Sequence, residues 1–509
     1  MPSRRPSAGA PPSAARSRSA PLNVLFVASE AEPFAKTGGL GDVLGALPKA
    51  LSELGHDVRV MLPRYRSVRP ERFGLRRVIE AFPVTVGAKT VPVAIDETTL
   101  PKSRVIVYFV DQPGCFDRDG LYQANGRDFP DNLERFSLLC EALLRAVPKL
   151  GWRPDLVHCH DWQTALLIPR LAADPRLEAC WRGVGRVFTV HNLAYQGLFP
   201  ETSWPSTNLP RQLFGVQGLE FYGQINCLKG ALLFAQAITT VSPTYAKEIQ
   251  TPAFGCGLDG VLVSRREALT GILNGIDADE WNPAADAHLP SRYSVGQLAG
   301  KSVCKLSLQR QLGLPEHHVL LVGMIQRLVE QKGIDLVMRS AEQLLALPLQ
   351  LVVLGTGERA YHEALAQLAK RYPERLSVTL RFDEPLSHQI EAGCDALLMP
   401  SRFEPCGLNQ MYSMRYGTVP IVRRIGGLAD TVTDVTPQTL QAGRATGFVF
   451  EEYTTKALVD AVKRAVTAFG DHALWGQVVR AGMERDDSWA RSAKEYVRVY
   501  EWVMAARPQ

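Results

Sequence analysis

Two short segments in the second half of the chain carry residues that could bind a diphosphate. Arg327 and Lys332 lie close together in the sequence, just before a helix that is predicted to start near Gly333. A guanidinium that binds two oxygens and a compact ammonium suit a diphosphate better together than either alone, although a pair of solvated surface cations is the alternative. Further on, Gly426-Gly427 opens another predicted helix, so we expect its backbone N–H groups to be free to meet an anion.

A carboxylate follows a buried strand in the same region. The apolar run 396–399 stops at Pro400, as a buried parallel strand would, and open α/β sheets bind ligands just beyond the carboxyl ends of such strands. Apolar residues then recur with helical spacing over 408–416, and 419–422 is predicted as the next strand. Glu404 is therefore expected to face a cleft.

In the first half, a strand predicted at 23–30 leads into a glycine-rich turn and a helix with the sequence KTGGLGDV. This order suggests dinucleotide binding, but the spacing is not GxGxxG. The next predicted strand, 57–62, ends in Pro-Arg instead of the acidic residue that would bind a ribose, so we do not expect NAD. Lys36 in this turn is either a site residue or a solvated lysine, and the motif alone favours neither.

Predicted strands and helices alternate through the rest of this half, at 105–110, 133–146, 155–159, 186–190 and 237–241. Such alternation favours a parallel sheet with helices on both faces. The strand at 155–159 runs into the sequence HCHDW, which invites a metal assignment. A catalytic zinc needs about three protein ligands, and neither HExxH nor a second cluster completes the set. The sequence predicts no metal here.

A boundary between two domains is predicted near residue 270, where the segment TGILNGIDADEWNP is rich in turn formers. Asp277 and Asp279 form a DxD pair, which can hold a divalent metal. Here the pair lies among Asn, Gly and Pro, where Asp commonly bonds its own backbone, so the turn interpretation is favoured. Alternation resumes beyond, with strands predicted at 351–357 and 378–382.

Length and composition fit an ordinary two-domain protein. A chain of 509 residues exceeds what one core usually serves, and 46% hydrophobic with 21% charged residues is typical of soluble globular proteins. A net charge of +5 gives little support to nucleic-acid binding. Nine scattered cysteines without CxxC pairs indicate a reduced, cytoplasmic protein. No apolar run is long enough for a membrane span, and the Arg- and Ser-rich stretch before Pro21 is interpreted as a disordered tail.

The motifs KTGGLGDV, HNLAYQG, RLVEQKG, FEPCGL, YGTVPIVRR and GGLADTV occur together and in the order of the bacterial and plant glycogen and starch synthases, which this chain closely resembles. That family consists of retaining glucosyltransferases that extend α-1,4-glucan from nucleotide-activated glucose. The resemblance implies ADP-glucose and glycogen as substrates, no cofactor and no membrane or nucleic-acid partner. Val329 departs from the family pattern, in which a small polar residue is frequent.

The resemblance also implies a fold and a domain division. We expect the GT-B architecture, an α/β fold in which two Rossmann-like domains face a central cleft. The expected parts are a basic tail (1–21), an acceptor-side domain (22–270), a nucleotide-sugar domain (271–485) and a C-terminal helix that packs back on the first domain (486–509).

Site residues follow from the same resemblance. Catalytic roles are implied for Glu404, His191, Lys332, Arg327 and Asp161. Binding of ADP-glucose is implied for Lys36, Gly38, Gly39, Asn274, Arg327, Lys332, Phe382, Glu404, Cys406, Gly407, Gly426 and Gly427. Phe382 is the expected platform for the nucleotide base, although a core phenylalanine is the commoner fate of that residue type.

Three alternatives remain at this point. A glycoside hydrolase would need two carboxylates about 5–10 Å apart, and the cations around the predicted site argue against one. A glucan phosphorylase would need a lysine-bound pyridoxal phosphate, whose motifs are missing. A catalytically silent glucan-binding protein would not be expected to keep all of these motifs intact.

Overall fold

The structure, a computed structural model, describes residues 20–124, 126–174 and 177–506. The chain forms two compact units. Among the described residues, the first takes in those up to Val241, Ala246–Ile272 and those from Ser492 onward, and the second comprises Ser242–Tyr245 and Leu273–Arg491. The predicted basic tail lies, up to residue 19, outside the described residues.

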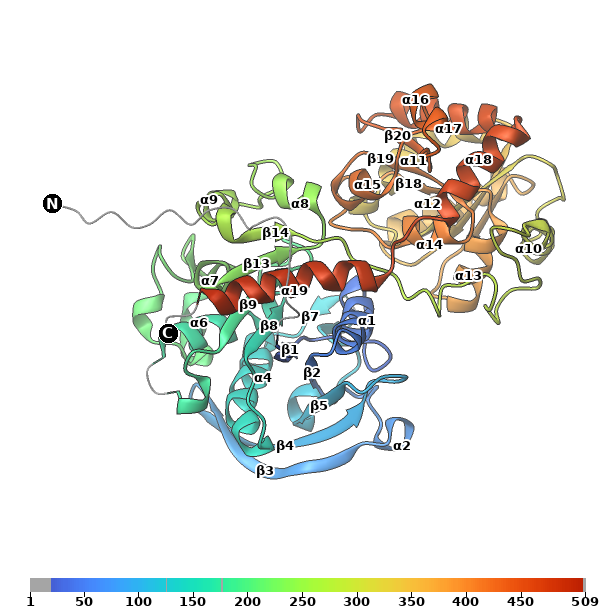
Figure 1. Cartoon of the computed structure of the whole chain (residues 1–509). Coiled ribbons are helices and arrows are strands. Elements are labelled where there is room, and N and C mark those ends of the chain that lie inside the picture. Colours follow the sequence, from blue (N-terminus) through green and yellow to red (C-terminus); the bar gives the residue numbers. More distant parts are fainter. Residues whose placement is uncertain (1–19, 125, 175–176, 507–509) are drawn as a thin grey trace. The chain divides into compact units, whose positions relative to one another are not determined.

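The first unit is built on a nine-stranded sheet with the order β14-β13-β9-β8-β1-β2-β5-β4-β3 (Figure 1). Its strands are β1 (Asn23–Val27), β2 (Asp57–Pro63), β3 (Arg76–Val86), β4 (Lys89–Thr99), β5 (Ile106–Asp111), β8 (Leu156–His160), β9 (Gly185–Val190), β13 (Ala237–Thr240) and β14 (Leu269–Gly271). The principal helices are α1 (Gly39–Glu53), α4 (Asn132–Ala146), α6 (Leu167–Ala173) and α7 (Cys227–Phe234). The strand order reverses between β1 and β8, and open α/β sheets bind ligands at such a switch point.

One edge of this sheet departs from the predicted parallel pattern. Strands β3 and β4 form an antiparallel hairpin, and β4 also pairs antiparallel with β5. The hairpin turns at Gly87, whose φ of +57° suits glycine. A small antiparallel sheet of β10 (Leu198–Pro200), β12 (Gln224–Asn226) and β11 (Glu220–Phe221) was also not predicted.

The second unit contains a six-stranded, all-parallel sheet with the order β17-β16-β15-β18-β19-β20. Its strands are β15 (Leu320–Ile325), β16 (Leu349–Leu354), β17 (Leu376–Thr379), β18 (Ala396–Met399), β19 (Val419–Arg423) and β20 (Phe448–Phe450). The order reverses between β15 and β18, which places a second switch point there.

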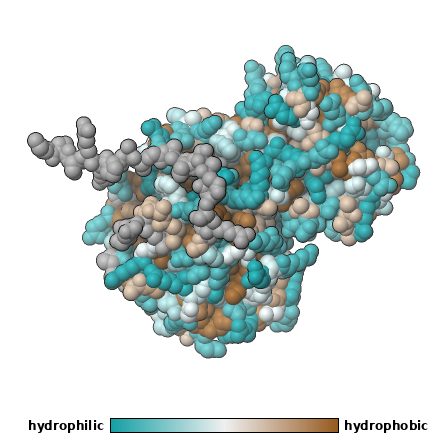
Figure 2. All heavy atoms as spheres, viewed as in Figure 1, coloured by the Kyte–Doolittle hydropathy of each residue, from teal (hydrophilic) through white to brown (hydrophobic). Residues whose placement is uncertain are grey.

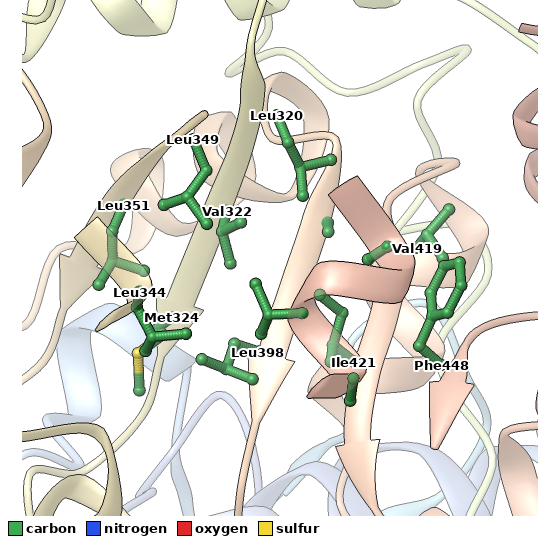
Figure 3. Close-up of a cluster of buried hydrophobic side chains, with 14 of the residues drawn as sticks. Leu320, Val322, Met324, Leu344, Leu349, Leu351, Leu398, Val419, Ile421 and Phe448 are labelled. Atoms are coloured by element: carbon green, nitrogen blue, oxygen red, sulfur yellow. The ribbon is translucent and has the colours of Figure 1, made fainter. Parts of the chain in front are cut away.

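Helices cover the second sheet, and apolar side chains fill the space between. The principal helices are α10 (Ala299–Gln311), α11 (Ile334–Leu345), α12 (Arg359–Arg371), α13 (Glu384–Gly393), α14 (Asn409–Arg415), α15 (Gly426–Thr431), α17 (Thr455–Phe469) and α18 (His472–Met483). Figure 3 shows how Met324, Leu398, Ile421 and Phe448, from four different strands, meet in one buried cluster. Because these strands are buried on both faces, they appear in the sequence as short continuous apolar runs.

The C-terminal helix α19 (Trp489–Ala505) groups with the first unit from Ser492 onward. Its Tyr496, Tyr500 and Val503 are fully buried. The Tyr500 hydroxyl lies 2.8 Å from Nδ1 of His158 on β8, so the helix is tied to the centre of the first sheet.

No helix in the described residues is both long enough and apolar enough to cross a membrane. The face shown in Figure 2 is largely hydrophilic, with hydrophobic residues scattered among the polar ones. Such scattered exposure is ordinary for a protein surface.

Candidate active site

A buried ion pair lies at the switch point of the second unit. Nζ of Lys332 is 2.6 Å from Oε2 of Glu404, and their side chains are only 16% and 6% exposed. The hydroxyl of Ser401 donates to the same carboxylate oxygen at 3.0 Å. Two of the residues implied by the sequence are therefore in direct contact, although they lie far apart in the chain.

Local backbone geometry brings the two partners together. Gly333 has a φ of +76°, and a Cβ at this position would lie 2.1 Å from the carbonyl oxygen of Pro400. The backbone N–H of Arg402 donates to the carbonyl of Gln331 at 2.9 Å. A glycine is required here because the two segments approach each other backbone to backbone.

The expectation that both amides of the glycine pair are free is wrong for Gly427. Its N–H donates to the carbonyl of Glu404 at 3.1 Å. A Cβ at Gly426 would lie 1.9 Å from that same carbonyl, and one at Gly427 would lie 2.1 Å from the carbonyl of Cys406. The pair is thus needed for close packing of α15 against residues 404–406, and it fixes the backbone that carries Glu404.

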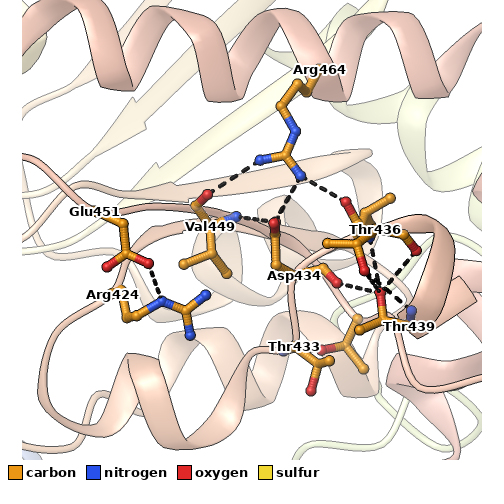
Figure 4. A network of polar contacts seen from close by, with 10 residues as sticks. Arg424, Thr433, Asp434, Thr436, Thr439, Val449, Glu451 and Arg464 are labelled. Carbon is orange, nitrogen blue, oxygen red and sulfur yellow. Dashed lines mark hydrogen bonds and ion pairs between the residues drawn. The ribbon is translucent and has the colours of Figure 1, made fainter.

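A polar network supports the chain on either side of α15 (Figure 4). Asp434 accepts hydrogen bonds from the backbone N–H of Val449, at 2.8 Å, and from the Arg464 guanidinium, at 2.9 Å. Arg424 binds Glu451 at 2.5 Å. These contacts join the segment after α15 to β20 and α17, and they join the residue after β19 to the residue after β20. Arg424 therefore has a structural partner.

The other predicted residues of the second unit differ in their surroundings. Cys406 is buried, which raises the pKa of its thiol to about 12. Asn274 is also buried, and its Oδ1 has no hydrogen-bond partner among the described residues. Gly407 has a φ of +71°. Arg327 is exposed, with Nη2 3.5 Å from Oε1 of Gln331.

Phe382 does not end a strand as predicted, because β17 stops at Thr379. It lies in the link between β17 and α13, and 82% of its surface is exposed. The alternative of a core phenylalanine is therefore wrong, and the ring is open to a ligand.

A buried carboxylate organises the switch point of the first unit. Glu30, just after β1, is 3% exposed. It accepts hydrogen bonds from the backbone N–H and the hydroxyl of Thr37, at 2.5 and 2.7 Å, and from the Tyr122 hydroxyl at 2.5 Å. The backbone N–H of Gly38 also points at it, at 3.3 Å. Glu30 thereby fixes the turn that carries Lys36, Gly38 and Gly39.

Lys36 lies between two acidic side chains of this turn. Its Nζ is 2.7 Å from Oδ1 of Asp42 and 3.6 Å from Oε2 of Glu32, and its side chain is 37% exposed. Burial raises the pKa of Asp42, and the neighbouring Lys36 opposes that shift. The ammonium of Lys36 is thus held by Asp42 and Glu32, which differs from the alternative of a solvated lysine without fixed partners.

His191 and Asp161 meet at the ends of β9 and β8. Oδ1 of Asp161 accepts the backbone N–H of His191 at 2.7 Å, and Asp161 has a φ of +55°, unusual for a residue with a side chain. Burial raises the pKa of Asp161 to about 7. Burial also lowers the pKa of His191 to about 3, so its ring is neutral at neutral pH.

The DxD pair has the predicted turn geometry. Oδ1 of Asp277 accepts the backbone N–H groups of Asp279 and Glu280, at 3.0 and 3.2 Å. Within the described residues, no group of three or more His, Cys, Asp or Glu is arranged to hold a metal ion.

The comparisons with known proteins agree with one another and together cover most of the chain. Residues 23–264 match the model of the starch synthase catalytic domain, and residues 308–472 match that of the group 1 glycosyl transferases. Glycogen synthase 1 of Methylococcus capsulatus is 48% identical over 490 residues, which covers 95% of this chain and 97% of the relative. The glycogen synthase of Anaeromyxobacter dehalogenans strain 2CP-C is 50% identical over 485 residues, covering 94% of this chain and 99% of the relative. The chain belongs to the glycogen and starch synthase family.

A solved structure of the same family confirms the predicted fold. The catalytic domain of starch synthase IV from Arabidopsis thaliana, bound to ADP and acarbose, superimposes with a TM-score of 0.89 at 35% identity, covering 96% of this chain and 100% of that one. Sucrose-phosphate synthase of Thermosynechococcus elongatus, at 17% identity and a TM-score of 0.59, shares the fold. The prediction of two Rossmann-like α/β domains in the GT-B architecture is therefore confirmed.

In this member of the glycogen and starch synthase family, sequence reasoning missed residues that hold the site in place. Ser401, Glu30, Tyr122 and His160 each contact a predicted site residue or its loop. An acidic residue at the carboxyl end of the strand predicted at 23–30 could have identified Glu30. Nothing in the local sequence identifies Tyr122, because its partner Glu30 is 92 positions away.

Proposed function

We propose that this protein is a glycogen synthase that transfers glucose from ADP-glucose to the non-reducing 4-hydroxyl of an α-1,4-glucan with retention of configuration. The observation that carries the proposal is the buried Lys332–Glu404 pair at the switch point of the second unit, in a chain of this family. The ADP in the related starch synthase IV structure supports an adenosine diphosphate donor.

Negative charge grows on the departing nucleoside diphosphate as the glucosyl–phosphate bond breaks. Cations that are fixed in place before the reaction stabilise such charge without reorganising, and this is usually the largest catalytic contribution. Lys332 is held in position by its contact with Glu404, and Arg327 extends into solvent nearby in the sequence. We assign both to the diphosphate, with Lys36 as a third cation from the first unit.

Glu404 is suited to hold the sugar. Its Oε2 accepts hydrogen bonds from Lys332 and Ser401, whereas Oε1 makes no hydrogen bond within the described residues. Oε1 can therefore accept hydrogen bonds from glucose hydroxyls, and the carboxylate can stabilise the positive charge of an oxocarbenium-like sugar. Asn274 and the backbone around Cys406 and Gly407 complete the donor side of the proposal.

On the first unit, the neutral His191 ring is assigned to the transferred glucose. Asp161 fixes the backbone of that histidine, so it is a positioning residue in this proposal. The exposed ring of Phe382 is assigned to the adenine base. All nine cysteines carry free thiols, which supports a reducing, cytoplasmic location.

The rival functions give different products in one experiment. The full-length protein is incubated with glycogen and labelled ADP-glucose, with labelled UDP-glucose in a parallel sample. We expect label in the polymer, with ADP-glucose the better donor. Release of reducing sugar without incorporation would indicate a hydrolase, and retention on glycogen without turnover would indicate a silent glucan-binding protein.

A further inference from the structure

Three histidines from neighbouring strands lie side by side in the first unit. His158 and His160 are on β8, and His191 follows β9, the next strand in the sheet (Figure 1). Nδ1 of His160 is 2.9 Å from Nε2 of His191. The ring of His160 lies 4.2 Å from that of His158 and 5.4 Å from that of Phe26, centroid to centroid, so two neighbouring rings pack against it and restrict its orientation.

The hydrogen bond between His160 and His191 contains one proton, which is carried either by Nδ1 of His160 or by Nε2 of His191. Both rings are neutral at neutral pH, because burial lowers the pKa of each. A neutral imidazole carries its proton on one nitrogen and accepts at the other. The shared hydrogen bond therefore has two possible directions, and each direction sets the tautomer of both rings.

The second nitrogen of His160 decides between the two directions. Nε2 of His160 is buried and has no hydrogen-bond partner among the described residues. If this nitrogen carried the proton, a buried N–H would be left without an acceptor, which proteins rarely tolerate. If the proton is on Nδ1, only a lone pair is left unused.

We propose that His160 is a positioning residue whose Nδ1–H donates to Nε2 of His191, so that His191 carries its own proton on Nδ1. Nδ1 of His191 makes no hydrogen bond within the described residues. It is then a fixed N–H donor, able to bind a hydroxyl oxygen of the transferred sugar. This inference rests on the proposed function for its catalytic meaning, but the tautomer itself does not depend on it.

The tautomer can be measured on the unaltered protein. Histidine is labelled with ¹⁵N, and the imidazole spectrum is recorded at neutral pH, with His191→Asn used to assign the signals of His191. In a neutral ring the protonated nitrogen resonates far upfield of the unprotonated one. We expect the proton of His191 on Nδ1, and a proton on Nε2 would overturn the proposal whether or not the protein transfers glucose.

Two substitutions test the effect on the reaction. Counted in bonds from Cβ, the amide of His160→Asn occupies the place of Nδ1, whereas the amide of His160→Gln occupies that of Nε2. We expect the Asn variant to keep turnover within about threefold of the parent and the Gln variant to lose at least about tenfold, the scale of one hydrogen bond. The Michaelis constant for glucan should change little in the Asn variant.

Equal turnover of the two variants, whether both are active or both inactive, would overturn the positioning role. Melting temperatures of both variants are recorded first, because a role limited to packing would lower stability without separating Asn from Gln. If the Gln variant does not fold, the spectrum of the parent still decides the proposal. A parent without transferase activity but with His191 protonated on Nδ1 would refute the proposed function and leave the tautomer standing.

Discussion

Removing Lys332 should damage stability and activity together, and a second substitution should separate the two effects. In Lys332→Met the carboxylate of Glu404, 6% exposed, loses the ammonium 2.6 Å away. Breaking a buried pair by removing one partner costs about 3–5 kcal/mol, and the 16% exposure of the lysine side chain favours the lower end. For a unit of this size about 3 kcal/mol lowers the melting temperature by roughly 6–12 °C.

In the double variant Lys332→Met/Glu404→Gln both charges are gone, so no unpaired ion remains. We expect its melting temperature to return to within about 4 °C of the parent, which restores about 1–2 kcal/mol of the roughly 3 kcal/mol lost in Lys332→Met. Turnover should remain at least about 10²-fold below the parent in both variants, because the diphosphate still lacks its cation. The matched control is Lys463→Met, which replaces an exposed lysine on α17. Its free energy of unfolding should stay within about 0.5 kcal/mol of the parent.

Calorimetry on the full-length protein, together with the glucose incorporation assay, measures both quantities. A double variant that melts as low as Lys332→Met would show that the pair is not coupled in the way its geometry implies. Near-parent turnover in Lys332→Met, with its structure intact by circular dichroism, would refute the assignment of this lysine to the diphosphate.

Three further predictions follow from other parts of the structure. Phe382→Ala should raise the Michaelis constant for ADP-glucose more than it lowers turnover, since base stacking is equal in the ground and transition states; an unchanged Michaelis constant would contradict the stacking role. Dialysis against EDTA should leave turnover unchanged, because a carboxylate oxygen of Asp277 already accepts a hydrogen bond from the backbone N–H of Asp279. Activity that is lost on dialysis and restored by magnesium or manganese would instead indicate a metal bound by Asp277 and Asp279. Asp161, whose pKa burial raises to about 7, stabilises the fold below about pH 4 and loses that contribution as the pH rises to 7. Relative to the parent, Asp161→Asn should therefore gain about 1.4 kcal/mol in the free energy of unfolding per pH unit between pH 4 and 7. If the free energies of unfolding of variant and parent differ by the same amount over this whole range, the raised pKa is refuted.

Buried parallel strands and their helices were the most predictable part of the fold. The strand predicted at 396–399 agrees with β18 at both ends, because a fully buried strand is a continuous apolar run with a clear stop. The β3–β4 hairpin was not predicted. Pro83 and Pro92, which face each other in it, argue against central strands. They are tolerated because Pro83 is on the edge strand β3 and Pro92 precedes Ala94, where the pairing of β4 with β5 begins.

The types of the site residues were predictable, but their partners were not. Glu404 was expected just beyond a strand and Lys332 just before a helix, yet their contact depends on β15 and β18 being neighbours, which no local pattern encodes. The expectation of a free amide at Gly427 was wrong for a related reason. A rule about helix N-termini considers one helix alone, whereas the close approach of residues 404–406 supplies an acceptor from elsewhere in the chain.

Locating the transferred glucose in the product tests the central claim most directly. Glycogen labelled from ADP-glucose is treated with an exo-acting glucanase that cleaves only α-1,4 bonds, starting at non-reducing ends. Retaining transfer to the terminal 4-hydroxyl predicts that the label is released in the first small fraction of digestion. Label that resists this enzyme, or label that appears only after the inner chains are cleaved, would contradict the account.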